Sequence, residues 1–337
     1  MPRFYAVLIS LISAWLVLCA FSLSVGSIDI PLNDVFQNLF GIEPIDTRYA
    51  LIIEEYRMPK LITASMAGAA LAVSGLLMQT LFSNPLAGPY ILGISSGASL
   101  GVAFLVLGIS FFPSLSQTAW LQYSTVFGAW VGATSLMLIV LAVAKRIQSA
   151  VTLLITGLMF GYIASSIVSI LSYFSTAEQL QTFFIWNMGS FSNVQWSSMP
   201  VYIGVISLGL FLSILCSHPL NAMLMGENYA SSIGVPIKLM RMIVIVISSL
   251  LAGTTTAFCG PISFLGIAVP HIARSLLKSS DHRILMPVCI AAGMFIAVCS
   301  DLIAGWPGSQ KVLPLNAITS LLGAPFVIYI ITRSSKR

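Results

Sequence analysis

The feature that most constrains this chain is a stretch of 84 residues, from Leu61 to Ala144, that contains no Asp, Glu, Lys or Arg. Soluble domains are roughly one quarter charged, whereas this chain is 7% charged and 58% hydrophobic. A water-soluble fold would leave such a stretch without a solvated face. A helix that crosses a bilayer needs about 20 apolar residues. The sequence therefore predicts an all-α integral membrane protein and excludes soluble and disordered classes.

Shorter charge-free stretches separate the remaining ionisable residues, and most of them are long enough for one helix. The runs are too long and too uniformly apolar for a membrane β-barrel, whose segments alternate over about ten residues. The 84-residue stretch holds three helices, separated by turn residues. We predict ten transmembrane helices, over residues 4–25, 59–82, 90–109, 119–143, 152–173, 199–216, 239–256, 261–277, 284–304 and 315–332.

The Lys and Arg residues concentrate on one side of these predicted helices. If the N-terminus lies inside, the outer segments hold four of the 15 basic residues, namely Arg48, Arg57, Lys60 and Lys311. Cytoplasmic loops of membrane proteins carry an excess of Lys and Arg. We therefore expect both termini in the cytoplasm. The prediction is a single transmembrane permease domain over 1–337, with an external segment at 26–57 and a cytoplasmic loop at 217–238.

An internal similarity indicates a repeat. Residues 66–75 match residues 251–260 at an offset of 185, with small residues coinciding at Ala67/Ala252, Gly68/Gly253, Ala72/Ala257 and Gly75/Gly260. The two copies lie on the second and seventh predicted helices, an odd number of crossings apart, so they run in opposite directions, as in the inverted repeats of transporters. We expect helices two to five to repeat as helices seven to ten; the alternative is that the small residues serve packing alone. Glycines four residues apart predict close helix contacts, at Gly93/Gly97/Gly101, Gly128/Gly132 and Gly157/Gly161.

Residues that carry chemistry are scarce in the predicted helices. No Asp, Glu, Lys or Arg lies in the middle of a span, whereas such residues mark the ion pathways of secondary transporters. The chain has no HExxH and no GxxxxGK[ST] motif, which argues against a metalloprotease and excludes an ATP-binding P-loop. The five cysteines form no CxxC and are interpreted as small buried side chains; the three histidines are expected in loops or at helix ends. We predict no catalytic site, metal, cofactor or nucleic-acid partner, and an energy source in another polypeptide.

Several segments are more specific than generic membrane helices. They are Arg57-Met-Pro-Lys60, the run from Gly68 to Gln79, Asn84-Pro-Leu-Ala-Gly-Pro-Tyr-Ile-Leu-Gly-Ile-Ser-Ser-Gly97, Trp186-Asn-Met-Gly-Ser190, the run from Gly260 to Arg274, and Leu322-Gly-Ala-Pro-Phe326. In order and over nearly the whole chain, they resemble the permease subunits of FecCD-type ABC importers. That family imports iron–siderophore chelates, haem and cobalamin. The resemblance implies a permease dimer in the lipid of the bacterial inner membrane, two cytoplasmic ATPase subunits and an external binding protein.

The resemblance also implies the segment that couples the permease to the ATPase. The family pattern G-E-x-x-A-x-x-L-G is matched by Gly226, Glu227, Ala230, Ile233 and Gly234, with Ile233 in the place of Leu. A short helix here would place Ala230 and Ile233 on one apolar side, which would fit a groove on the partner. An ordinary amphipathic turn is the alternative interpretation.

The resemblance further implies a docking site and a gate. Arg57 and Lys60, three residues apart on one helix face, match basic residues that meet acids of the binding protein. A third basic residue of the family is missing at its usual place, and Lys311 is a candidate substitute. The cytoplasmic gate is implied at Asn84, Leu86, Ala150 and Val151.

The sequence is therefore compatible with two functions. The first is the permease subunit of an ABC importer for a bulky metal chelate. The alternative is a stand-alone secondary transporter or channel, which would need an ion gradient and no coupling segment. The absence of charges from the middle of the spans favours the first function.

Overall fold

The computed structural model describes residues 2–26, 28–41, 47–108, 121–147, 149–305 and 312–334, and within these ranges the elements are helices. The N-terminal part contains α1 (Pro2–Ser24), α2 (Leu32–Leu39), α3 (Thr47–Leu51), the π-helical η1 (Ile52–Arg57) and α4 (Met58–Leu81). The middle part contains η2 (Pro89–Leu92), α5 (Ile94–Val106), α6 (Leu121–Ala144), α7 (Ala150–Tyr173), α8 (Ala177–Asn187), η5 (Phe191–Asn193) and α9 (Met199–Leu215). The last part contains α10 (Ser217–Leu224), α11 (Glu227–Ser232), α12 (Ile237–Cys259), α13 (Leu265–Leu277), α14 (His282–Ala304) and α15 (Leu315–Ser334).

Each predicted membrane helix overlaps one helix of the structure: α1, α4, α5, α6, α7, α9, α12, α13, α14 and α15. Among the described residues, six helices are long and apolar enough to cross a membrane, or seven if the bent pair α9–α10 is one span. The apolar helices α5, α13 and α15 are shorter. The chain is thus a multi-pass membrane protein with an all-α fold.

The short helices α5 and α13 differ from the prediction in where they begin. Each has 13 residues and spans about 20 Å at 1.5 Å per residue. The predicted helix at 90–109 starts as the 3₁₀ turn η2, and the one at 261–277 becomes helical only at Leu265. Pro89, Leu92 and Ile262 are buried in these irregular segments. Irregular backbone is tolerated at membrane depth where protein covers it, which explains the difference.

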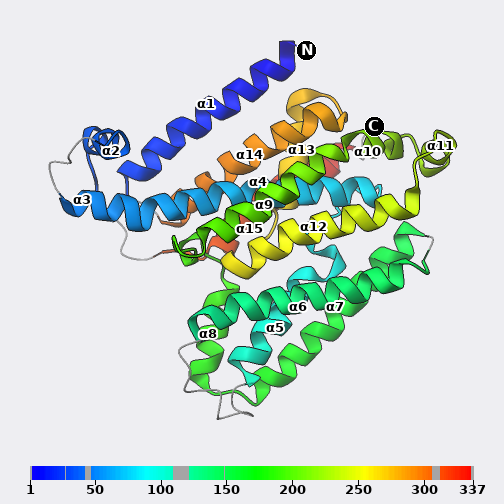
Figure 1. Cartoon of the computed structure of the whole chain (residues 1–337), viewed down its shortest axis with the longest axis horizontal. Helices are drawn as coiled ribbons and strands as arrows, with labels where there is room; N and C mark the ends of the chain where they lie inside the picture. Colours follow the sequence, from blue (N-terminus) through cyan, green and yellow to red (C-terminus); the bar gives the residue numbers. More distant parts are fainter. Residues whose placement is uncertain are drawn as a thin grey trace.

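Two helices, α4 and α12, lie at the centre of the molecule (Figure 1). α4 packs against α12, α13 and α14, whereas α12 packs against α5, α6 and α9. The helices α5–α8 form the lower part of the view, and α12 separates them from the rest. In the most apolar stretch of 18 residues within Thr47–Leu81, which includes α4, 83% of the stretch is buried. In the corresponding stretch of α1 the buried share is 6%. α1 therefore lies on the outside of the bundle.

The helices α4 and α14 run antiparallel and define two ends of the bundle. Lys60, at the start of α4, contacts Asp301 near the end of α14; we name this the Arg57 end. Thr80, near the end of α4, contacts His282 at the start of α14; we name this the Glu227 end, because α11 also lies there.

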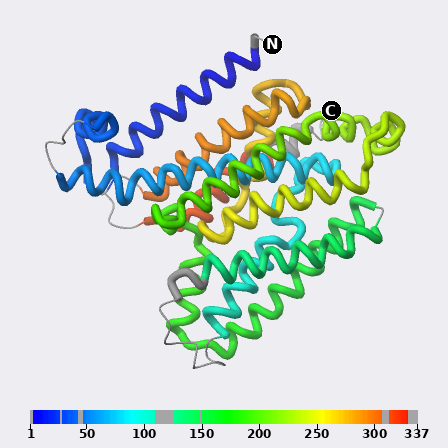
Figure 2. The backbone as a smooth tube through the Cα atoms, in the orientation of Figure 1, coloured from blue at the N-terminus to red at the C-terminus, as the bar shows by residue number. Residues whose placement is uncertain are grey.

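The first residues of the chain also lie at the Glu227 end. Arg3 Nε donates to Leu276 O, at the end of α13, over 2.8 Å. Figure 2 shows that the last helix, α15, ends toward the same side of the molecule as α10 and α11. Arg3 and the described end of α15 therefore lie toward one end of the bundle.

The order of helix lengths agrees with the predicted repeat. α4, α5, α6 and α7 have 24, 13, 24 and 24 residues, and α12, α13, α14 and α15 have 23, 13, 23 and 20. The predicted offset of 185 is wrong at the glycines that suggested it. Gly75 lies in the middle of α4, whereas Gly260 follows the last residue of α12 with a φ of 74°. A better correspondence is that α5 and α13 both follow a residue in the left-handed region, Gly93 (φ 76°) and Phe264 (φ 66°).

Glycines bring α4 into backbone contact with α13 and α14. A Cβ atom added to Gly68 would lie 2.1 Å from Gly293 O on α14, and one added to Gly75 would lie 1.7 Å from Gly266 O on α13. No side chain fits at either crossing. In lipid, helices associate through close packing rather than through the hydrophobic effect, so these crossings hold the centre of the bundle together.

The predicted glycine pairs of α5 and α6 also meet. A Cβ atom on Gly101 would lie 1.9 Å from Gly128 O, and one on Gly132 would lie 2.1 Å from Gly97 O. The prediction that these glycines allow close helix contact is confirmed.

We predict that Gly75→Ala lowers the melting temperature of the purified protein in detergent. The new methyl group would push α4 away from α13, and such overpacking costs about 1–3 kcal/mol. Gly204→Ala is the matched control, because Gly204 lies in α9 with nothing within 4 Å of an added Cβ. The control should be unchanged or up to about 1 kcal/mol more stable, since Ala favours the helix over Gly. Equal melting temperatures for the two variants would contradict the role of the crossing.

Candidate functional site

The segment between α9 and α12 forms two short helices at the Glu227 end. The chain bends by 53° between α9 and α10. Gly226 (φ 106°) and Gly234 (φ 90°) then bracket α11. Both φ values are strained for residues with a side chain and are readily adopted by glycine. The spacing of the two glycines in the sequence therefore sets the length of α11.

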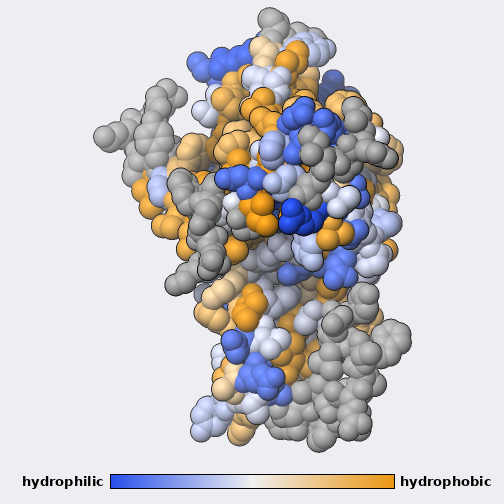
Figure 3. Space-filling view, turned by 90° about the vertical axis from the view of Figure 1, so that its left-hand side faces the viewer, coloured by the Kyte–Doolittle hydropathy of each residue, from blue (hydrophilic) through white to orange (hydrophobic). Residues whose placement is uncertain are grey.

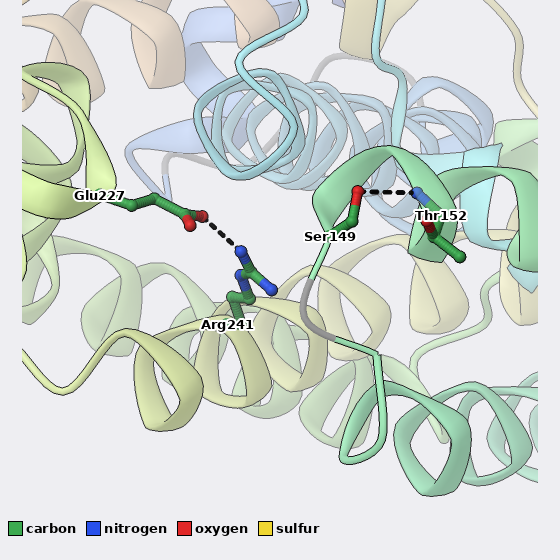
Figure 4. Close-up of polar contacts among 4 residues, drawn as sticks. All are labelled: Ser149, Thr152, Glu227 and Arg241. Atoms are coloured by element: carbon green, nitrogen blue, oxygen red, sulfur yellow. Dashed lines mark hydrogen bonds and ion pairs between the residues drawn. The ribbon is translucent and has the colours of Figure 1, made fainter.

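An ion pair fastens α11 to the start of α12. Glu227 Oε1 lies 2.5 Å from Arg241 Nη2 (Figure 4). The Arg241 side chain is 9% exposed and that of Glu227 is 46% exposed. A guanidinium in such a buried position needs an anionic partner, so Glu227 is held on the α12 side of the segment.

Ala230 and Ile233, which were predicted to share one apolar side, differ in burial. Ala230 is 0% exposed, whereas Ile233 is 56% exposed. Ile233 follows the last residue of α11, and its N still donates to Tyr229 O over 3.2 Å, so the helical turn reaches Ile233. The exposed apolar side chains of the segment also include Met225 and Tyr229.

The turn after α4 contains the predicted gate residues Asn84 and Leu86. Asn84 Oδ1 accepts from Leu86 N (2.9 Å), and Asn84 N donates to Gln79 O of α4 (3.1 Å). His271 Nε2 lies 2.8 Å from Pro85 O, so α13 also holds this turn. Leu86 is 40% exposed.

The other predicted gate residues, Ala150 and Val151, begin α7. Ser149 caps this helix, because its Oγ accepts from Thr152 N over 3.4 Å (Figure 4). Val151 is 64% exposed. The start of α7 lies at the same end of the molecule as the turn after α4 (Figure 1). Among the described hydrogen bonds, none joins the two pairs of gate residues.

Arg57, the first predicted docking residue, is bound within the chain. Its Nη1 donates to Leu23 O over 2.6 Å, and its Nη2 donates to Ile28 O. A Cβ atom on Gly26 would lie 2.8 Å from Nη2, so the loop after α1 closes around the guanidinium. Arg57 thereby fixes the connection between α1 and α2.

Lys60, the second predicted docking residue, lies 3.0 Å from Asp301 Oδ1 through its Nζ. The Lys60 side chain is 29% exposed and that of Asp301 is 11% exposed. Both line a pocket of about 850 Å³ at the Arg57 end, together with Arg57, Glu55 and Trp196. Figure 3 shows this end, where hydrophilic and apolar side chains are mixed. The third candidate, Lys311, lies outside the described residues.

A polar network at the Glu227 end was not singled out by the sequence. Asn221 of α10 bonds through Oδ1 to His282 N (2.8 Å) and to His282 Nδ1 (2.7 Å). The other ring nitrogen, Nε2, lies 2.8 Å from Thr80 Oγ1 of α4. His282 is 1% exposed and Thr80 is 4% exposed. The expectation that His282 lies at a helix end is confirmed, since it is the first residue of α14.

Asp281 caps α14 beside this network. Its Oδ1 accepts from Arg283 N (2.9 Å) and from Asn221 Nδ2 (2.6 Å). Burial alone would raise the pKa of Asp281, but these hydrogen bonds and the charge of Arg283 lower it below its ordinary value. The carboxylate is therefore ionised at neutral pH and remains an acceptor for Asn221.

The residues that could bind a metal do not cluster. In the part of the chain that the structure describes, no group of three His, Cys, Asp or Glu could hold a metal ion. The five cysteines are free, and three of them are buried, as predicted for small apolar side chains.

Comparison with known proteins assigns the chain to a family. Residues 14–333 match the FecCD transport family. The vitamin B12 import system permease protein BtuC of Klebsiella pneumoniae is 36% identical over 296 residues, which are 88% of this chain and 86% of that protein. The protein of the same name from Salmonella typhi is 34% identical, over 87% of both chains.

A solved structure is similar over almost the full length. It is described as an inward-facing conformation of a transporter assigned to the metal-chelate ABC type. The TM-score is 0.84 at 25% identity, over 97% of this chain and 99% of the other. The relatives are transport components rather than enzymes.

We predict that Lys60→Met destabilises the protein more than the double variant Lys60→Met/Asp301→Asn. The single change leaves a largely buried carboxylate without its partner, which costs about 1–3 kcal/mol or more. The double change also removes the charge, so part of the stability returns. Melting temperatures of the three proteins in one detergent test this. A double variant that is less stable than Lys60→Met would show that the pair does not act as a unit.

Proposed function

The chain belongs to the FecCD transport family, and we propose that it is the transmembrane permease subunit of an ATP-driven importer for a bulky metal chelate. The observation that carries this proposal is the match of nearly the whole chain to vitamin B12 import permeases. Vitamin B12 is therefore the first candidate cargo, and iron–siderophore and haem complexes belong to the same class of large chelates. The structural similarity to a metal-chelate type ABC transporter supports the same class.

The proposed assembly lies in the bacterial inner membrane. It contains two permease chains, two ATPase subunits in the cytoplasm and one binding protein on the outside. Basic residues concentrate on one side of the predicted helices, which supports the assignment of that side to the cytoplasm. This side corresponds to the Glu227 end. The chain has no P-loop motif, so ATP hydrolysis belongs to the partner subunits.

The segment formed by α10 and α11 is proposed as the contact with the ATPase. Its exposed apolar side chains, Met225, Tyr229 and Ile233, support this, since an interface needs a few apolar anchors. Gly226 and Gly234 fix the length of α11, and Glu227 and Ala230 attach it to the bundle through the Arg241 pair and through burial. The solvent-exposed face of the segment is thus held in one orientation.

The pocket at the Arg57 end is proposed as part of the docking surface for the binding protein. Lys60 is a half-buried cation there, and an acid of the partner would compete with Asp301 for it. Arg57 contributes by holding the loop after α1, and Lys311 remains a candidate from the sequence. Charged pairs at the rim of an interface mainly set orientation and association rate.

The cytoplasmic gate is proposed at the turn after α4 and at the start of α7. Asn84 and Leu86 lie in the first element, and Ala150 and Val151 in the second. The exposure of Leu86 and Val151 at the Glu227 end supports this placement. Tilting of the helices that carry these residues would open or close the constriction.

We predict that uptake of vitamin B12 into proteoliposomes requires the permease, its ATPase, ATP and the binding protein together. Liposomes with the permease alone should take up no more than empty liposomes, because the chain has no P-loop motif for ATP. Uptake that continues without the ATPase and follows an ion gradient would favour the stand-alone transporter. Iron–siderophore and haem complexes, tested in the same system, identify the cargo within the class.

We predict that Ile233→Asp reduces co-purification of the ATPase with the permease by tenfold or more, which is about 1.4 kcal/mol of binding free energy. The carboxylate would have to be desolvated in the interface. Ser280→Asp is the matched control, because it adds the same charge to an exposed position between α13 and α14 at the same end. If both variants retain the ATPase as the unchanged protein does, α11 is not the contact.

A further inference from the structure

The strongest unexplained feature is the path of buried polar contacts from α10 to the end of α4. Asn221 of α10, His282 of α14 and Thr80 of α4 follow one another over 2.7 Å and 2.8 Å. Each residue lies on a different helix. The path therefore joins the proposed ATPase contact segment to a central helix of the bundle through side chains alone.

The hydrogen-bond pattern places a proton on Nδ1 of His282. Asn221 Oδ1 accepts from His282 N, and Asn221 Nδ2 donates to Asp281, so the amide orientation is determined. Oδ1 can then accept from His282 only if Nδ1 carries the proton. In the neutral ring the Nε2 lone pair accepts the Thr80 hydroxyl proton, which otherwise goes to Leu76 O at 3.0 Å. A neutral imidazole with its proton on Nδ1 thus satisfies every atom of the path.

Stability of the α10 contact alone does not require this path. Leu220 and Met223 of the same helix are 0% and 5% exposed and anchor α10 by apolar burial. Asp281 already caps α14 through Arg283 N. A buried imidazole between two polar partners is costly unless it is fully bonded. The path adds a directional connection that apolar packing would not supply.

The path ends one helical turn before the proposed gate. Thr80 precedes Asn84 by four residues, and Asn84 N is bonded to Gln79 O. The side chain of Gln79 in turn accepts from Arg274 Nη1 of α13 over 2.6 Å. The last turn of α4 is therefore held on one side by α13 and on the other by His282.

We propose that Asn221, His282 and Thr80 are positioning residues that transmit a displacement of α10 to the turn after α4. The inference rests on the proposed function, in which α10 and α11 contact the ATPase and this turn is part of the gate. His282 is the middle of the path, because its two ring nitrogens contact α10 and α4 at the same time. Movement of α10 without movement of Thr80 would break one of these two bonds in a buried environment.

The experiment uses the complete complex of permease, ATPase and binding protein in lipid nanodiscs. Leu86→Cys provides a probe in the turn, and its rate of maleimide modification is measured by mass spectrometry with and without ATP and vanadate. Into this parent we introduce Thr80→Val, which removes the hydroxyl and keeps the shape, or Asn221→Leu. Thr80→Ser restores the hydroxyl. Thr255→Val is the control for a buried threonine whose hydroxyl bonds within its own helix, to Leu251 O.

In the parent and in the Thr80→Ser and Thr255→Val variants, nucleotide should change the modification rate severalfold. In Thr80→Val this ratio should fall to near unity while the complex still assembles and hydrolyses ATP. In Asn221→Leu, which lies in the proposed contact segment, the ratio should fall to near unity in the complex that assembles. The double variant should be no worse than either single variant, because one break already interrupts the path. A nucleotide response of Thr80→Val equal to that of the parent would overturn the inference.

The outcomes separate this inference from the proposed function. A parent that does not assemble with the ATPase contradicts the proposed function itself. If the parent assembles and hydrolyses ATP but nucleotide does not change the modification rate at residue 86, the proposed gate is contradicted. The inference, which depends on that gate, is then overturned as well. A loss of the response in Thr255→Val as well would assign the effect to general loosening of the bundle and would also overturn the inference.

Discussion

Contact between helix backbones at glycine positions is the interaction on which the rest of this structure depends. In lipid, apolar side chains gain little by leaving one apolar environment for another, so close packing has to hold the helices together. Gly75 lies against Gly266, and Gly101 lies against Gly128, with no room for a side chain. The crossings of α4 bring its two ends beside the two ends of α14. The Lys60–Asp301 pair and the His282 contact can form only because that alignment is already set.

The helices could be predicted from the sequence because a membrane imposes a length on each of them, and that length is visible as a gap between charges. The breaks before α5 and α13 could not be predicted in the same way. A buried irregular segment such as that around Pro89 is as apolar as the helix that follows it, so hydropathy does not distinguish the two. The 185-residue offset failed for a related reason, since small residues recur in every packed membrane helix and match by composition alone.

The candidate site was predictable where the backbone itself requires a residue type. Gly226 and Gly234 have positive φ values, so the pattern in the sequence reports a conformation. Side-chain partners were not predictable. Arg57 looked like a surface cation, but it donates to a carbonyl at the end of α1 and to one in the loop that follows α1. His282 meets Thr80 across 202 positions of sequence, and no local pattern encodes a contact of that kind.

The double attachment of the α10–α11 segment has a mechanical consequence. Glu227 ties α11 to α12, and Asn221 ties α10 to α14 and, through His282, to α4. A segment that is bonded to the bundle at one point can rotate about that point, so an applied force rotates the segment without moving the bundle. A segment that is bonded at two points, to different helices, cannot rotate freely and transmits its displacement to both central helices. In the proposed assembly, a displacement of this segment by the ATPase would therefore reach both central helices.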